Sequence, residues 1–101
     1  MSDPKQINGD LKTPMWLLPP VAKVACARVL ALGATKYGPW NWRDDRICRS
    51  TYISAIHRHM DAWQEGQALD PESGESHLAH VMANCCILLD ALQQGTLIED
   101  E

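Results

Sequence analysis

The chain has 101 residues, of which 46% are hydrophobic and 22% charged, and its formal net charge is −4. This composition is typical of one globular domain and excludes a disordered chain. The negative charge argues against binding to long nucleic acids, and no apolar run reaches the roughly 20 residues of a membrane span. The polar N-terminus lacks the apolar core of a signal peptide, so we expect a cytoplasmic protein without a membrane partner.

The first element expected after a polar, turn-rich arm over residues 1–13 is an amphipathic helix over about 20–37. Pro20 suits the first position of a helix, where its missing N–H is no loss. From there, apolar residues recur at steps of three and four, which is the spacing of one helix face. That face comprises Val21, Val24, Ala25, Val29 and Leu32.

The segment that follows, KYGPWNWRDDR from Lys36 to Arg46, mixes turn formers with aromatic and basic residues. In one interpretation the tryptophans wedge this loop onto the core. In the other, an aromatic side chain stacks on a base while cations meet phosphates. Both can hold, because one tryptophan can anchor the loop while the other stacks. The candidate residues for nucleotide contact here are Lys36, Tyr37, Trp40, Asn41, Trp42 and Arg43.

A second helix is expected over about 48–65, with an apolar stripe that repeats at the helical period. At about 100° per residue, His59 lies about 60° from the centre of this stripe and His57 about 100° away. His59 should therefore face the interior edge of the helix, and His57 should point toward solvent.

A third helix is expected over about 71–94. Asp70 followed by Pro71 has the pattern of an N-cap and a first helical residue, and Glu72 and Glu75 would suit the first turn. The adjacent cysteines Cys85 and Cys86 lie in an apolar run and are expected to be buried.

The third helix is apolar around most of its circumference, so it should be central in a bundle or buried between subunits. No clear strand pattern is present, and the tail over residues 96–101 is expected to be mobile. We therefore expect an all-α fold over residues 14–95. It would be a compact bundle of three main helices, completed by formation of a homodimer or higher homo-oligomer.

The four histidines lie within one predicted helical hairpin, close to several carboxylates. His77 and His80 are three residues apart, which lets two imidazoles share one ion from a single helix. His59 could supply a third nitrogen, and Asp70 or Glu72 an oxygen. Imidazole with carboxylate is a ligand set for a divalent metal, here Mg, Mn, Zn, Ni or Co. Two alternatives remain open: the histidines could hydrogen-bond within a core, or bind phosphate directly.

The segments KYGPWNWR, RHMDAW and DPESG followed by HLAH resemble a family of small phage and prophage proteins, the dATP/dGTP diphosphohydrolases. The resemblance covers residues 12–92. It implies an all-α protein that cleaves a purine deoxynucleoside triphosphate to the monophosphate and pyrophosphate in the cytoplasm of a bacterial host. The matching positions are Lys36, Tyr37, Gly38, Asn41, Trp42, Arg43, Arg58, His59, Asp70, Glu72, Gly74, His77 and His80.

The function expected from these observations is metal-dependent hydrolysis of dATP or dGTP, which would shape the dNTP pool during phage replication. His59, His77 and His80, with Asp70 or Glu72, would hold the metal. Lys36, Arg43 and Arg58 would neutralise phosphate charge. Glu72 or Glu75 would be the general base. Two rival hypotheses are a non-catalytic nucleotide-binding protein that sequesters a signalling nucleotide, and a helical interaction module whose histidines are core residues.

Overall fold

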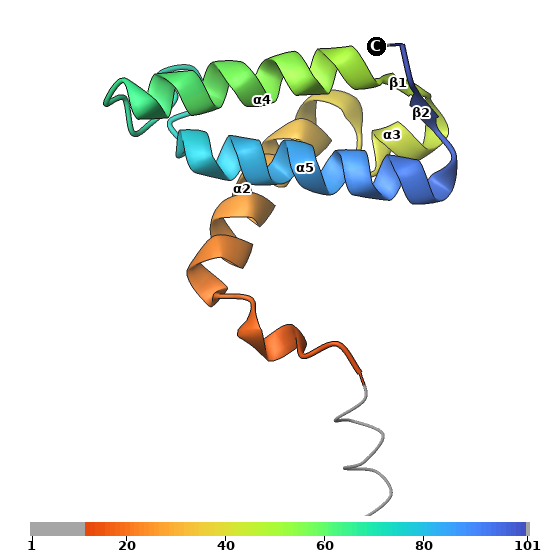
Figure 1. Ribbon diagram of the computed structural model, residues 1–101, viewed down its shortest axis with the longest axis horizontal. Helices are drawn as coiled ribbons and strands as arrows, with labels where there is room; N and C mark the ends of the chain where they lie inside the picture. Colours follow the sequence, from red (N-terminus) through yellow and green to blue (C-terminus); the bar gives the residue numbers. More distant parts are fainter. Residues whose placement is uncertain (1–11, 101) are drawn as a thin grey trace, which may run out of the picture.

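The computed structural model describes residues 12–100, and most of the arm expected over residues 1–13 lies outside this range. Over the described residues the chain is mainly helical, with three long helices and little strand, which confirms the predicted all-α class (Figure 1). The elements are a 3-10 turn (Met15–Leu17), α2 (Pro20–Tyr37), α3 (Asn41–Asp44), β1 (Ile47–Cys48), α4 (Arg49–Gln64), α5 (His77–Gln94) and β2 (Leu97–Ile98). No helix within residues 12–100 is both long and apolar enough to cross a membrane.

Helix α2 begins at Pro20 and ends before Gly38, whose φ of 89° is one that side chains rarely adopt. Its bounds agree with the prediction, but its buried face does not. Val21 and Val24 are 78% and 58% exposed, and the buried residue of the helix is Cys26. Cys26 faces α5, where its Sγ lies 3.7 Å from Cys86 Sγ, while the first turns of α2 extend beyond the α4–α5 hairpin (Figure 1).

Helices α4 and α5 run side by side in opposite directions, and α2 crosses behind α5 (Figure 1). The small side chains of Ala79, Ala83 and Ala91 are the most buried apolar residues of α5. Small residues at these positions allow the helices to approach closely. The expected burial of Cys85 and Cys86 is wrong, because both are exposed.

The third long helix starts at His77, six residues later than predicted. Asp70 is not its N-cap: the Asp70 carboxylate instead accepts the backbone N–H of Glu72 within a turn. The cap is Ser76, whose hydroxyl accepts the N–H of Leu78 at 3.1 Å. The connector closes on itself through a single antiparallel bridge between Leu69 and Ser76.

The core lies where α3 and the two strands meet the end of α5. Trp42, Ile47 and Ala91 are buried there, packed against half-buried residues of four elements. The two short strands pair in parallel, with Ile47 opposite Leu97. Residues 97–98, expected to belong to a mobile tail, thus join a sheet, and Asp100 hydrogen-bonds to Ser50. The two strands are departures from the strand-free expectation.

Candidate functional site

A pocket of about 970 Å³ lies between α2, α4 and α5 and reaches the loops before α3 and before α5. One end is lined by His59, Asp70 and His80, and the other by the aromatic loop. Two groups far apart in the sequence, the histidine–carboxylate cluster and the aromatic–basic segment, therefore share one cavity.

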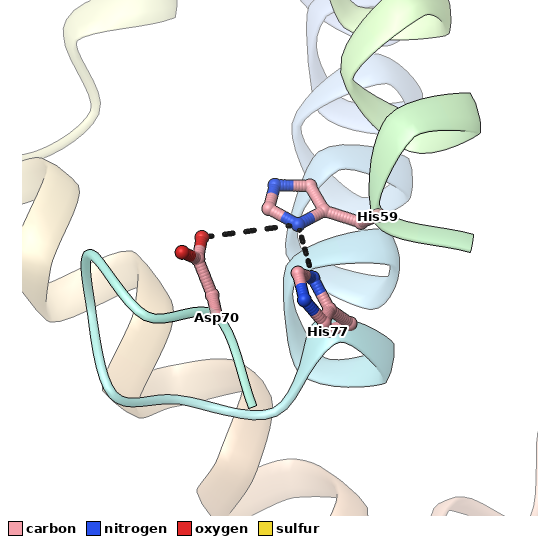
Figure 2. Close-up of side chains that lie close together, drawn as sticks. All are labelled: His59, Asp70 and His77. Atoms are coloured by element: carbon pink, nitrogen blue, oxygen red, sulfur yellow. Dashed lines mark hydrogen bonds and ion pairs between the residues drawn. The ribbon is translucent and has the colours of Figure 1, made fainter. Parts of the chain in front are cut away.

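Three ligand-type side chains gather beside the first end of the pocket, which His59 and Asp70 line while His77 is buried and does not line it (Figure 2). His59 comes from the last turns of α4, His77 from the first residue of α5, and Asp70 from the connector between them. The Nδ1 atoms of the two histidines lie 2.8 Å apart, and an Asp70 oxygen lies 3.9 Å from His59 Nδ1. One potential ligand atom from each residue falls within 4.8 Å of the others. Two imidazole nitrogens and one carboxylate are a common set for a catalytic divalent ion.

The second nitrogen of His77 fixes the orientation of this ring. His77 Nε2 is 2.7 Å from Gln67 Oε1, and because an amide oxygen only accepts, Nε2 must carry the proton. The lone pair of His77 is then on Nδ1, which faces His59. Without a metal, Nδ1–H of His59 donates to this lone pair. With the His59 proton on Nε2 instead, both Nδ1 atoms offer lone pairs to the same point.

His80 lies beside this group but outside the set of three. Its ring stacks on His59 with the centroids 4.2 Å apart, and its Nε2 is 2.7 Å from the Ser73 hydroxyl. The same nitrogen lies 3.5 Å from an Asp70 oxygen. In this geometry His80 supports His59 and Asp70, and it is less well placed than His77 to share an ion with His59.

The surroundings favour the neutral form of His59 and His80 and the ionised form of Asp70. Burial lowers the pKa of both His59 and His80, and the carboxylate of Asp70 only partly opposes this. Burial alone would raise the pKa of Asp70. The N–H of Glu72 and the neighbouring imidazoles outweigh it and lower that pKa. Neutral imidazole and ionised carboxylate are the forms that bind metal.

We expect the metal-free protein to lose stability as the pH falls below the ordinary histidine pKa of 6.5. His59 and His80 bind protons at a higher pH in the unfolded chain than in the folded protein. Their contribution to the free energy of unfolding is therefore complete above the ordinary pKa. It is lost as the pH falls through the folded pKa values. Urea denaturation in EDTA between about pH 7.5 and about pH 5 measures this slope. The double variant His59→Gln/His80→Gln should show a flatter profile, and an unchanged slope would contradict the assignment.

The two candidate general bases lie in different places. Glu72 lines the pocket, with a side chain 85% exposed and 3.9 Å from the Lys36 ammonium. Glu75 does not line it, because its carboxylate is held by the Arg28 guanidinium at 3.1 Å on the far side of the connector. Of the two, only Glu72 can therefore reach a ligand in the pocket.

The two tryptophans at the aromatic end of the pocket differ in burial and in their contacts. Trp42 is 9% exposed, and its Nε1–H donates to Asp90 at 2.7 Å. Trp40 is 55% exposed, lines the pocket, and has the Arg43 guanidinium 4.2 Å from its ring centroid. Arg43 also forms a two-bond ion pair with Asp90. Trp42 and Arg43 thus anchor the loop, while Trp40 remains available for stacking.

The remaining predicted contacts fall on the pocket wall, namely Lys36, Tyr37, Asn41 and Arg58. Arg43 does not line the pocket, since Asp90 and Trp40 engage it. His57 is exposed, as its position on the helix predicted. Sequence reasoning missed Gln67, Ser73 and Asp90. Asp90 could have been found as the one Asp, Glu, Lys or Arg in the apolar run over residues 81–94, but nothing in the sequence marks Gln67 or Ser73 as partners of histidine.

Comparison with known proteins places the sequence of this chain in a family. A sequence model described as "dATP/dGTP diphosphohydrolase, N-terminal" matches residues 2–101, nearly the whole chain. The chain belongs to this family.

One relative of the family is a protein of Salmonella phage PMBT28 named dATP/dGTP diphosphohydrolase. It is 32% identical over 89 residues, which cover 88% of this chain and 30% of the phage protein. The chain thus spans about three tenths of the length of that relative. No solved structure matches the chain.

Proposed function

We propose that the pocket binds a purine deoxynucleoside triphosphate and hydrolyses it to the monophosphate and pyrophosphate. The observation that carries this proposal is the shared cavity, with a ligand set for a divalent metal at one end and an exposed tryptophan at the other. The family match and the name of the phage relative support the same activity. A homo-oligomeric assembly is part of this proposal.

The histidine–carboxylate end fits a divalent metal through its own residues. His59, His77 and Asp70 would hold the ion, with His80 and Gln67 as the partners that orient them. When bound, such an ion polarises a phosphoryl oxygen and lowers the pKa of a coordinated water. The lowered pKa values of His59 and Asp70 favour the neutral imidazole and the ionised carboxylate that metal binding requires.

The other residues of the pocket suit the triphosphate and the base. Lys36 and Arg58 bring positive charge to the wall between the two ends, where phosphates would lie. Trp40 offers a ring face to a base, and Asn41 offers an amide that can read its edge. The negative net charge of the chain does not oppose this, because only a few local cations are needed.

The reaction would be attack of water on the α-phosphorus. A bond forms from the water oxygen to that phosphorus, and the bond to the oxygen that bridges to the β-phosphate breaks. Pyrophosphate leaves with that bridging oxygen. Glu72 is the general base that the pocket offers, and its pairing with Lys36 at 3.9 Å is loose enough to be exchanged for a water. Lys36 would then be free to bind a phosphate.

The test is hydrolysis by the purified protein over dGTP, dATP, dCTP and dTTP, with Mg²⁺, Mn²⁺, Zn²⁺ or Co²⁺ in turn. Release of monophosphate and pyrophosphate from the purine substrates supports the enzyme. Release of inorganic phosphate alone, or no turnover with any ion, would overturn it.

A second candidate is a nucleotide-binding protein without catalysis. The mutual hydrogen bond of His59 and His77 favours it, because these histidines are satisfied without a metal. Calorimetric titration with the same nucleotides separates the two: tight binding to the metal-free protein without turnover under any ion supports the binder.

Gln67→Ala tests whether the metal site depends on the orientation of His77. Loss of the 2.7 Å contact should free the ring and weaken metal affinity by about 10–100-fold, as for other partners of metal ligands. Calorimetric titration with Zn²⁺ or Mn²⁺ measures this. Gln64→Ala, an exposed glutamine at the end of α4, is the matched control and should keep the affinity of the unmodified protein. Equal affinity in the two variants would contradict the role of Gln67.

A further inference from the structure

The exposed face of α5 carries apolar side chains where a solvated helix normally carries charge. At about 100° per residue, five of them fall within an arc of about 80°. Leu89 and Leu92 are 70% and 54% exposed, and Leu78 is 37% exposed. We name these five the α5 stripe: Leu78, Met82, Cys85, Leu89 and Leu92.

The α5 stripe points away from the nucleotide pocket. Ile87 lines the pocket, and the centre of the stripe at Leu78 lies about 180° from it around the helix. Helix α5 contains one residue of the Asp, Glu, Lys and Arg types, Asp90. It lies outside the stripe and is paired with Arg43. In Figure 1, α2 crosses behind α5, and no element within residues 12–100 covers the opposite face of the hairpin.

The neighbouring helix extends this apolar surface. On α4, His59 faces the pocket, while Met60 and Ile53 lie about 100° and 120° further round, toward the uncovered face. Met60 is 37% exposed, and Trp63 near the end of the same helix is 46% exposed. Two adjacent helices thus present one apolar face.

We propose that this face, the α5 stripe with Ile53, Met60 and Trp63 of α4, binds a second copy of the chain. The stripe residues follow one another at steps of four, three, four and three, which is the heptad spacing of helices that pack along a seam. Such a seam is complementary to itself under a two-fold axis. Two α4–α5 hairpins joined in this way make a four-helix arrangement that closes both apolar faces.

The size of the face also suits a dimer. Its exposed side chains present on the order of 500 Å² of apolar surface, which is much of the roughly 800 Å² per partner in a stable complex. A two-fold axis through the middle of the stripe places Cys85 next to Cys85 of the other copy. The assembly depends on this surface and not on the nucleotide activity, because the pocket lies on the other side of the hairpin.

The test compares Leu89→Glu with Val21→Glu by sedimentation of the full chain. Val21 is the matched control, since it is an apolar helix residue 78% exposed on α2, the other apolar surface of the molecule. We expect the unmodified chain and Val21→Glu to sediment at about twice the 11.3 kDa of one chain, and Leu89→Glu as the monomer. A monomeric unmodified chain at about 200 μM, or dissociation by Val21→Glu but not by Leu89→Glu, would overturn the proposal.

If Leu89→Glu fails to fold, oxidative cross-linking tests the proposed contact between two copies of the chain. Mild oxidation of the unmodified protein should give a covalent dimer, and Cys85→Ser should abolish that dimer while leaving the circular dichroism spectrum unchanged. A covalent dimer that persists in Cys85→Ser, or a non-covalent dimer that never cross-links, would place the contact elsewhere.

Discussion

His77→Ala is expected to lower kcat/KM for the hydrolysis of dGTP by on the order of 10³-fold. His77 is 4% exposed, and its Nδ1 lies 2.8 Å from His59 Nδ1. In the proposed metal site its removal leaves His59 and Asp70, a pair with too few ligands to hold an ion tightly, and His80 beside them has its Nε2 engaged by Ser73 and Asp70. The measurement is pyrophosphate release with saturating metal, together with metal affinity by calorimetry.

His57→Ala is the control for this result. His57 is on the same hairpin but is exposed, so its loss should change kcat/KM by less than about twofold. Equal losses in the two variants would indicate a general effect on folding, and full activity in His77→Ala would exclude His77 from the proposed metal site. Circular dichroism of both variants is the folding control and should show intact helices.

Trp42→Ala is expected to destabilise the fold by about 3–5 kcal/mol, the usual cost of emptying a buried tryptophan site. Trp42 packs against Ile47 and Ala91 in the small core, and its Nε1–H is held by Asp90 at 2.7 Å. A chain of this size has little stability to spare, so the variant should be largely unfolded near 37 °C. Urea denaturation at 25 °C measures the change in free energy of unfolding.

Trp40→Ala makes the same chemical change at the exposed tryptophan. Its effect on stability should stay below about 1 kcal/mol, while nucleotide affinity should fall roughly tenfold through loss of a stacking surface. The burial of Trp42 and the exposure of Trp40 predict this difference between stability and nucleotide affinity. A large loss of stability in Trp40→Ala, with none in Trp42→Ala, would reverse their roles.

The helix bounds that could be predicted are those with strong local signals. Pro20 and Gly38 mark the ends of α2, and Gly66 follows α4 closely, so two of the three long helices lie within a residue of their expected ends. The prediction that His59 faces the interior edge of the helix and His57 faces solvent is also confirmed, because helical periodicity alone fixes which of them faces inward.

The start of α5 could not be predicted, because two cap patterns stand six residues apart. Asp70 with Pro71 fits a helix start as well as Ser76 does. The decision comes from the Leu69–Ser76 bridge and from the contacts of Asp70 with histidines of both helices. These interactions join residues distant in the sequence, so no local pattern shows them.

Two other features depended on tertiary contacts. The strands over 47–48 and 97–98 are too short to produce an alternating pattern, and they exist because α5 returns its end to the start of α4. The sequence also indicated an apolar face on α2 that the structure leaves largely exposed. Periodicity identifies a helix face that is apolar, but only packing shows what covers it.

The parallel pairing of β1 with β2 sets an order for folding. Ile47 donates its N–H to Thr96, so this contact closes a loop that contains all of α4 and α5. The pairing can form only after those helices have docked, and it is stabilised by few hydrogen bonds. In a hydrogen-exchange experiment the Ile47 amide would therefore report the opening of this pairing, separately from the amides within α4 and α5. Because β1 follows α3 closely in the chain, such opening would loosen the packing of Trp42 at the aromatic end of the pocket. The histidine end of the pocket would stay closed.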